Sequence, residues 1–436
     1  MRDDPGSGRP GLVGCAVAAA GIGWLGGPGT PAGGALPPRA PAETGQAAWR
    51  FGGEYGLYVG LSDAGLDVRW LTDDPVPGFV RALVDGSVAD ERRTPRGDTH
   101  QAQLNVDAPS VTLEYGAAGG ERVHRTEIRI GAPSRPEVDL PAPDSVFVFG
   151  DVHGEFDRVL QLLARAGLID AELRWTGGDA TVVLLGDLLD RGSDVTRLLW
   201  FLYALEREAE AAGGRVLTLL GNHEVMVMSG DLRYVSEKEM AIAERHGLSY
   251  AKLLDPAASV LGRWLAARPA LVRVGDLLLA HGGVSPEYLD YSLERYQDTL
   301  SAFISEPLFT GWHDPAFLEA FALETQLDSA QIYGRYDFFF APESVLWYRD
   351  LVFTDTLGAH LDAVLDRFGA AVHVVGHSPV RAIRQSYGGR LIAVDLLEAA
   401  AEMLLLARRP GGGRDRFAIG LGGELRPLPP GAAPGR

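Results

Sequence analysis

The stretch Phe149-Gly150-Asp151-Val152-His153-Gly154 decides the fold, and it continues the apolar run Val146–Phe149. A short apolar run bounded by glycine predicts a buried β-strand. Asp151 and His153 are two residues apart at the end of this strand, so an oxygen and an imidazole nitrogen can point toward one cation. Because a Gly-Asp-x-His-Gly string also occurs as an ordinary turn, its interpretation depends on the rest of the chain.

Four further predicted strands end in the same way, with a polar side chain beside glycine: Thr181–Leu185 before Gly186-Asp187, Arg215–Leu220 before Gly221-Asn222, Asp276–Ala280 before His281-Gly282, and Ala371–Val375 before Gly376-His377. Helical patterns over Phe156–Ala166 and Asp194–Ala212 alternate with them. This alternation predicts an α/β domain. Since ligand sites in α/β sheets lie at the carboxyl ends of strands, the five loops can line one shared binding site.

Six side chains of these loops offer oxygen or nitrogen ligands, and none offers sulfur: Asp151, His153, Asp187, Asn222, His281 and His377. Such a mixed set suits manganese, iron or zinc. Six ligands are too many for a single ion that keeps an open coordination position. They suit two ions that share Asp187 as a bridging ligand. We predict Asp151, His153 and Asp187 at one ion, and Asp187, Asn222, His281 and His377 at the other. Two ions about 3.5–4 Å apart can hold a hydroxide and clamp a phosphoryl group.

Taken together, the motifs resemble those of the metal-dependent phosphoprotein phosphatase family in order and spacing: Gly150-Asp151-x-His153-Gly154, Gly186-Asp187-x-x-Asp190-Arg191-Gly192, Gly221-Asn222-His223-Glu224, His281-Gly282-Gly283 and Gly376-His377. Met226–Val235, Gly262–Pro269 and Leu346–Arg349 resemble the bacterial-type branch called Shewanella-like protein phosphatases. The resemblance covers residues 145–407 and implies a calcineurin-like metallophosphoesterase fold, with a double β-sheet core flanked by helices. The chain departs from that branch at Val227, Asp350 and Ser378, none of which is a predicted ligand.

The resemblance also implies a mechanism in which a metal-bridging hydroxide attacks phosphorus directly, without a phospho-enzyme. His223 would protonate the leaving oxygen, and Asp190 would orient that imidazole. Arg191 and Arg349 would hold the phosphate oxygens, because guanidinium groups bind them bidentately. For Arg349 a second interpretation stays open, that of a surface cation beside a packed aromatic edge.

The sequence upstream of residue 143 has a different character. Short β-like runs between Gly, Asp and Pro predict an all-β, sandwich-like domain over residues 43–142, which ends in the proline-rich linker Pro133–Pro143. This domain carries no cluster of titratable groups, so a packing role and a substrate- or surface-binding role both stay open.

Residues 143–410 form the predicted metallophosphoesterase domain. Helical insertions are expected near 231–265 and 287–341, at the edge of the binding site. Arg390–Val394 and Met403–Leu406 are interpreted as a terminal strand pair. The C-terminal segment 411–436 is rich in proline and glycine, and its end is predicted to be disordered.

Composition excludes several classes of protein. A net charge of −18 and a pI near 5.0 exclude a nucleic-acid binder, which needs a basic face. The one cysteine, Cys15, excludes an internal disulfide and a cysteine-based zinc site.

Residues 1–42 are interpreted as a signal peptide or a disordered leader. Leu12–Leu25 is an apolar run of signal-peptide length, too short for a stable membrane span, but Asp3 and Asp4 offset the charge of Arg2 and Arg9. We expect export to the periplasm or the extracellular space, with a cytoplasmic location as the alternative. Lipidation at Cys15 is a further interpretation, although the apolar run follows this cysteine instead of preceding it.

These observations predict a hydrolase with two metal ions that acts on phosphomonoesters of proteins, at tyrosine or at serine and threonine. The alternative is a hydrolase of dinucleoside polyphosphates or other small phosphoesters, and a more distant one is a non-catalytic binding protein. No nucleic-acid partner is expected, and no sequence feature indicates an oligomeric state.

Overall fold

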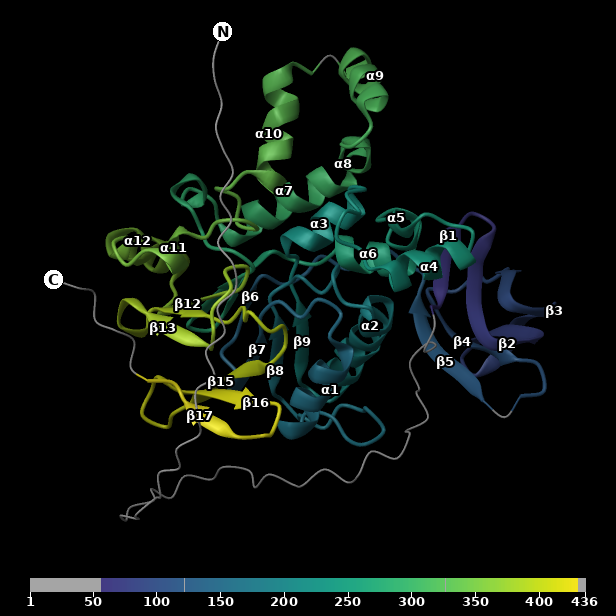
Figure 1. The fold of residues 1–436 in the computed structure, drawn as a ribbon, viewed down its shortest axis with the longest axis horizontal. Coiled ribbons are helices and arrows are strands. Elements are labelled where there is room, and N and C mark those ends of the chain that lie inside the picture. The colour runs from purple at the N-terminus through teal and green to yellow at the C-terminus, as the bar shows by residue number, and fades with distance from the viewer. Residues whose placement is uncertain (1–55, 121, 326, 430–436) are drawn as a thin grey trace, which may run out of the picture. The chain divides into compact units, whose positions relative to one another are not determined.

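The computed structural model describes residues 56–429 apart from 121 and 326 (Figure 1). The predicted leader, including Cys15, and the segment after residue 429 lie outside this range. Within it, no helix is long and apolar enough to cross a membrane.

The N-terminal part is one antiparallel sheet of five strands: β1 (Tyr58–Ser62), β2 (Gly65–Val84), β3 (Ser87–Leu104), β4 (Ser110–Ala117) and β5 (Val123–Arg129). Their order is β1-β2-β4-β5, and β3 pairs with β2. The register of the β2–β3 pair shifts at three places, and the first shift lies between Leu71 and Val76, beside Pro75 and Pro77. The all-β prediction is confirmed, although the described strands form one sheet and not the two sheets of a sandwich.

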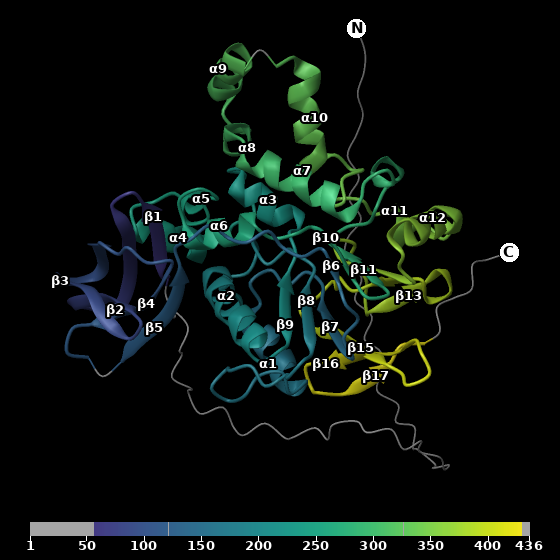
Figure 2. The same ribbon diagram turned by 180° about the vertical axis from the view of Figure 1, so that it is seen from behind.

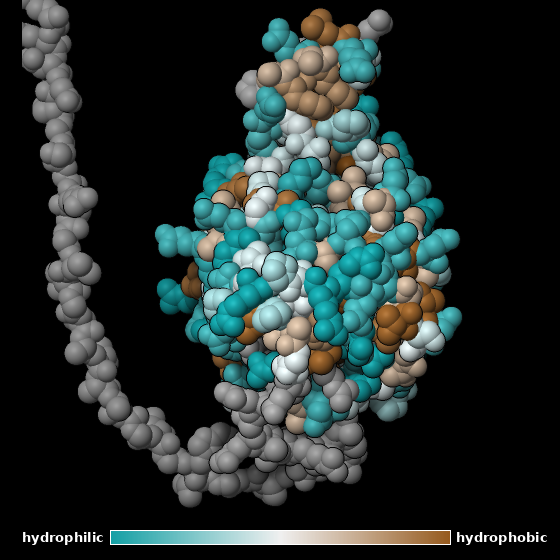
Figure 3. Space-filling model, turned by 90° about the vertical axis from the view of Figure 1, so that its right-hand side faces the viewer, coloured by the Kyte–Doolittle hydropathy of each residue, from teal (hydrophilic) through white to brown (hydrophobic). Residues whose placement is uncertain are grey.

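The first half of β3 escapes a pattern-based prediction because it carries the charged stretch Asp90-Glu91-Arg92-Arg93 instead of alternating apolar residues. Most of its side chains are exposed, and charged residues of this kind protect an edge strand from pairing with other chains. Figure 3, which looks onto this side of the molecule, shows a mainly hydrophilic face.

Two six-stranded sheets form the core of the larger domain. Core sheet 1 has the order β17-β16-β15-β7-β8-β9, with β7 (Ser145–Phe149), β8 (Thr181–Leu184), β9 (Arg215–Thr218), β15 (Glu402–Arg408), β16 (Arg414–Gly420) and β17 (Leu425–Pro427). Core sheet 2 has the order β13-β14-β12-β11-β10-β6, with β6 (Asp139–Leu140), β10 (Leu271–Val274), β11 (Leu277–Ala280), β12 (Val372–Val375), β13 (Arg384–Ser386) and β14 (Leu391–Ala393). The predicted double-sheet core is thus confirmed.

Parallel pairing within each core sheet brings strand ends together. In core sheet 1, β7, β8 and β9 are parallel neighbours, and in core sheet 2 so are β11, β12 and β14. The apolar runs of β7, β8 and β11 fit this arrangement, because strands covered on both faces need no polar alternation. The side chains of β7 and β11 are accordingly almost all buried.

Helices follow the strands and fill the insertions: α1 (Phe156–Arg165), α2 (Val195–Ala211), α3 (Asn222–Met228), α4 (Glu237–Arg245), α5 (Tyr250–Leu253), α6 (Val260–Ala266), α7 (Leu293–Ser305), α8 (Pro307–Gly311), α9 (Pro315–Thr325), α10 (Ser329–Phe340), α11 (Asp350–Phe353) and α12 (Gly358–Phe368), with 3₁₀ turns η1 (Pro286–Tyr288) and η2 (Tyr387–Gly389). α1 buries Phe156, Val159, Leu162 and Leu163 at helical spacing, each worth about 1.5–3 kcal/mol. Helices α9 and α10 form an arm that extends away from the core sheets in both views (Figure 1, Figure 2).

The N-terminal sheet is hydrogen bonded to the larger domain. Trp200 Nε1 on α2 donates to Leu57 O at 2.8 Å, and Leu61 N donates to Ala258 O at 2.6 Å. Arg129 N at the end of β5 donates to the Tyr203 hydroxyl at 3.0 Å. These contacts fix the sheet against α2 and the segment before α6.

Two expectations for the C-terminal part are wrong. The segments predicted as a terminal strand pair lie in different sheets, because β14 pairs with β12 whereas β15 pairs with β7. The larger domain also continues past the predicted boundary at residue 410, since β16 and β17 extend core sheet 1 as far as Pro427. The short apolar segments in Arg414–Pro427 are strand-forming, although glycine and proline surround them.

Candidate functional site

The candidate site lies where the loops after β7, β8, β9, β11 and β12 meet. Nine non-glycine residues of the described chain have positive φ, and five of them are predicted site residues: His153, Asp187, Asp190, Arg191 and His377. Such backbone is strained for L-residues and persists only where the surroundings enforce it. Gly186, with φ of 105°, is needed because a Cβ there would overlap the backbone nitrogen of Gly221. The loops after β8 and β9 can therefore approach closely enough to share ligands.

One group of predicted ligands converges on His281. Its Nδ1 lies 3.1 Å from Leu185 O, so this nitrogen carries the proton and Nε2 has a free lone pair. Around Nε2 lie Asn222 Oδ1 at 2.9 Å, His377 Nδ1 at 3.2 Å and Asp187 Oδ1 at 3.3 Å. The lone pairs of several buried atoms thus face and repel one another, and a bound cation would remove this repulsion.

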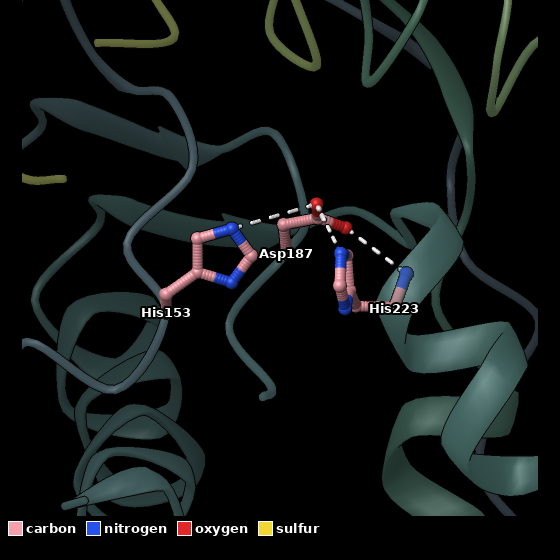
Figure 4. Close-up of side chains that lie close together, drawn as sticks. All are labelled: His153, Asp187 and His223. Carbon is pink, nitrogen blue, oxygen red and sulfur yellow. Dashed lines mark hydrogen bonds and ion pairs between the residues drawn. The ribbon is translucent and has the colours of Figure 1, made fainter. Parts of the chain in front are cut away.

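A second group gathers on the other oxygen of Asp187 (Figure 4). His153 Nε2 lies 3.8 Å and His223 Nε2 lies 3.7 Å from Asp187 Oδ2. His153 Nδ1 lies 2.8 Å from Leu189 O, so its Nε2 is the unprotonated nitrogen. Asp187 therefore stands between the two groups, as expected of a bridging carboxylate.

Asp151 joins the loops of the two core sheets. Its Oδ1 accepts a hydrogen bond from His377 N at 3.0 Å and lies 3.9 Å from His281 Nδ1. With these contacts, all the predicted residues except Arg349 are linked to at least one other predicted residue over less than 4 Å.

The ionisation of the cluster favours bound cations. Burial lowers the pKa of His153 and of His377 to about 3, so both rings are neutral at pH 7 and can act as ligands. Burial raises the pKa of Asp151 to about 6 and that of Asp187 well above its usual range. His153 Nε2, which faces Asp187, has no hydrogen-bond partner. Neutral imidazoles beside crowded carboxylates fit a pair of divalent cations.

The pKa shifts predict how pH affects metal-dependent stability. A folded-state pKa of about 6 for Asp151 against an ordinary 3.8 means that the metal-free protein loses stability as pH rises from about 4 to about 6. Cation binding needs the ionised form, so the gain in Tm on adding Mn²⁺ is expected to grow over this interval. Thermal unfolding with Mn²⁺ and with a chelator, measured at pH 5, 6 and 7, tests this. A gain that shrinks toward pH 7 would contradict it.

Glu224 on α3 holds the loop that carries Asp187. This fully buried carboxylate accepts hydrogen bonds from Gly221 N at 2.7 Å, Asp187 N at 2.8 Å, Leu188 N at 2.8 Å and Leu189 N at 3.1 Å. Its two oxygens thereby satisfy four backbone donors. The loop after β8 and the start of α3 are fixed to each other through one side chain.

Replacing Glu224 with Gln is expected to lower the free energy of unfolding by about 2–4 kcal/mol, because the new amide group faces N–H donors that then lack an acceptor. Denaturant unfolding of the metal-free protein at pH 7 measures this. Glu237→Gln is the matched control, since Glu237 is exposed in the first turn of α4 and its charge contributes less than about 1 kcal/mol there. Equal losses for both variants would show that Glu224 does not fix the loop.

His223 and its neighbours form a separate unit beside the ligand cluster. His223 Nδ1 lies 2.5 Å from Asp190 Oδ2, and both side chains are buried. Asp190 thereby fixes the ring with Nε2 toward Asp187, where Arg191 Nη2 approaches it at 3.3 Å. This pairing is what a general acid needs.

Arg191 and Arg349 are both exposed at the site. Arg349 precedes α11 and lies near enough to His377 and Asp395 to lower the pKa of each. A guanidinium on the solvent side of buried ligands is well placed for an anion. The open interpretation of Arg349 as a surface cation beside a packed aromatic edge fits these positions as well, since Tyr348 is buried and Arg349 is exposed.

Asp395, after β14, is a sixth strand-end residue that the sequence analysis missed. It is 3% exposed, and burial followed by the nearby Asp151 raises its pKa to about 9. At pH 7 it is therefore a neutral carboxyl hydrogen bonded to Asp151. Its signal was present, since it directly follows the apolar run Leu391–Val394, but no glycine accompanies it.

Asp395→Leu is expected to weaken Mn²⁺ binding about 10–100-fold, the usual effect of removing a group that orients a metal ligand. Asp395→Asn should weaken Mn²⁺ binding less than Asp395→Leu does, because its amide still donates a hydrogen bond to Asp151. Titration calorimetry with Mn²⁺ compares the two. Equal weakening would mean that the hydrogen bond is irrelevant to Asp151.

Comparison with known proteins places this site in context. Residues 145–397 match the Calcineurin-like phosphoesterase family. The chain is 33% identical over 204 residues to Shewanella-like protein phosphatase 2 of Arabidopsis thaliana, covering 37% of this chain and 52% of that protein. It is 31% identical over 142 residues to a symmetrical bis(5'-nucleosyl)-tetraphosphatase of Vibrio cholerae, covering 33% of this chain and 45% of the other.

The chain spans about half the length of these curated relatives. Among solved structures, one described as a cold-active protein tyrosine phosphatase superposes with a TM-score of 0.66 at 25% identity, over 86% of this chain and 96% of that one. The similarity therefore extends well beyond the residues of the site.

Proposed function

Because the chain belongs to the calcineurin-like phosphoesterase family, we propose that it is a metal-dependent phosphatase of phosphorylated proteins, acting at tyrosine or at serine and threonine. The observation that carries the proposal is Asp187, whose two oxygens each face a separate group of histidines. The relatives named as protein phosphatases support the substrate class.

In this proposal Asp151, His153 and Asp187 hold one ion, and Asp187, Asn222, His281 and His377 hold the other, with manganese, iron or zinc as the metals. Two such cations supply the positive charge that activates water and neutralises phosphoryl oxygens. The protein's own part is to keep these imidazoles neutral, which burial does, and to hold the carboxylates in place.

The remaining residues act on the substrate. Arg191 and Arg349 bind the phosphate oxygens that face solvent, since guanidinium is planar and always charged. His223 donates a proton from Nε2 to the leaving oxygen, while Asp190 accepts from Nδ1 and keeps the ring in place. The loop from Asp187 to Arg191 thus joins metal binding to substrate binding.

The test is a substrate panel with the purified full chain and added Mn²⁺. The proposal predicts hydrolysis of phosphotyrosine or phosphoserine peptides with higher kcat/KM than of diadenosine tetraphosphate. The reverse order would favour the alternative, a dinucleoside polyphosphate hydrolase, which the similarity to the Vibrio cholerae enzyme supports. If the protein hydrolyses neither the phosphopeptides, nor diadenosine tetraphosphate, nor an aryl phosphate, the non-catalytic binding protein is the interpretation that is left.

Export is a separate proposal, which rests on the apolar run Leu12–Leu25. Mass spectrometry of the mature protein recovered from culture medium or periplasm tests it. A product that stays in the cytoplasm with its first residues intact would overturn it.

A further inference from the structure

Tyr234 is a solvent-facing aromatic side chain beside the proposed general acid. It lies in the turn between α3 and α4, and 46% of its surface is exposed, whereas His223 is buried. The two ring centroids are 5.4 Å apart, at an interplanar angle of 53°. No role in ligand binding or in the proposed mechanism accounts for a large exposed aromatic ring at this place.

The backbone ties Tyr234 to the substrate-binding loop. Tyr234 O accepts a hydrogen bond of 2.8 Å from Arg191 N, so the backbone that carries the ring is held against the loop that carries Arg191. The next residue on the N-terminal side, Arg233, lies with its guanidinium 5.7 Å from the Tyr234 ring and is bound to Asp231. This turn is therefore held by the backbone oxygen of Tyr234 and by the ion pair of Arg233 with Asp231.

The position of the acid fixes where the leaving group goes. For proton transfer, His223 Nε2 must come within about 2.6–3.2 Å of the leaving oxygen. The organic part bonded to that oxygen then extends away from the buried acid toward solvent, where Tyr234 lies. A phenolic ring can pack there with its centroid 4.5–7 Å from that of Tyr234, as aromatic pairs do, whereas the single methylene of serine cannot.

We propose that Tyr234 is a specificity-determining residue that contacts the aryl part of the leaving group and so favours phosphotyrosine over phosphoserine. This inference rests on the proposed phosphatase function and assigns part of its substrate choice to one side chain. Packing of two aromatic rings adds roughly three- to ten-fold to kcat/KM for an aryl substrate.

The test compares two peptides that differ only in phosphotyrosine or phosphoserine, with the full chain and Mn²⁺. The measured quantity is the ratio of the two kcat/KM values. Intrinsic reactivity also favours phosphotyrosine, but it is the same for every variant, so a change in the ratio reports contacts alone. Tyr234→Leu should lower the ratio about three- to ten-fold, and Tyr234→Phe should keep it within two-fold.

Tyr333→Ala is the control, because Tyr333 is 64% exposed on α10 and is not part of the site. An unchanged ratio in Tyr234→Leu, or an equal fall in Tyr333→Ala, would overturn the inference while leaving the phosphatase function intact. Failure of the unmodified protein to hydrolyse either peptide would instead refute the proposed function. Metal content measured for each variant shows whether a fall in the ratio of the kcat/KM values comes from loss of metal or from loss of the ring contact.

Discussion

His223→Asn lowers kcat for a phosphoserine peptide by about 10²–10⁴-fold, which is the usual contribution of a positioned general acid. The kcat for an activated aryl phosphate should fall far less, because its leaving group departs without needing a proton. The structural basis is the buried pair of His223 and Asp190, which directs Nε2 toward Asp187. Steady-state kinetics on both substrates, with saturating Mn²⁺, measure the difference.

Asp190→Asn serves as a graded companion to this variant. It keeps the size of the side chain but removes the charge that faces His223 Nδ1, so its losses should fall between those of the unmodified protein and of His223→Asn. Metal content should stay the same in both variants, since neither residue is a proposed ligand. Equal losses on the two substrates would argue that His223 positions the substrate or a metal and does not deliver a proton.

The convergence of the six predicted ligands could be foreseen from sequence because each of them follows a predicted strand and stands beside glycine, two signals that are both local. Asp395 has the first signal and lacks the second, and its partner Asp151 is distant in sequence. Its role depends on the parallel pairing of β14 with β12, which no local pattern reveals. Tyr234 is similar, since only the fold brings its ring to His223.

Strand partners were the weaker part of the prediction, for a physical reason. An apolar run shows that a strand is buried but not in which sheet, so β14 and β15 looked like neighbours although they belong to different sheets. β16 and β17 carry mixed polar residues because they lie toward the edge of core sheet 1, where one face or one edge meets solvent. Edge strands such as these and β3 have the least distinctive sequences.

Asp187→Asn should have the largest effect on metal binding. The carboxylate is 1% exposed and offers one oxygen to each histidine group, so its charge serves both ions. An amide keeps the shape but supplies a single neutral oxygen. The bound Mn²⁺ should fall from two ions per chain to one or fewer, and phosphatase activity by roughly 10³-fold, since metal ions supply several kcal/mol of charge stabilisation.

Elemental analysis and thermal unfolding separate loss of metal from loss of fold. Burial raises the pKa of Asp187 well above its usual range, so ionising this carboxylate destabilises the metal-free protein and the neutral amide avoids that cost. The metal-free variant should therefore unfold at the same or a higher temperature, while the rise in Tm on adding Mn²⁺ shrinks. Asp139→Asn, in an exposed ion pair with Arg273, is the control and should keep both ions. If Asp187→Asn still binds two ions per chain, Asp187 is not the bridge, and the division of the six ligands between two sites is wrong.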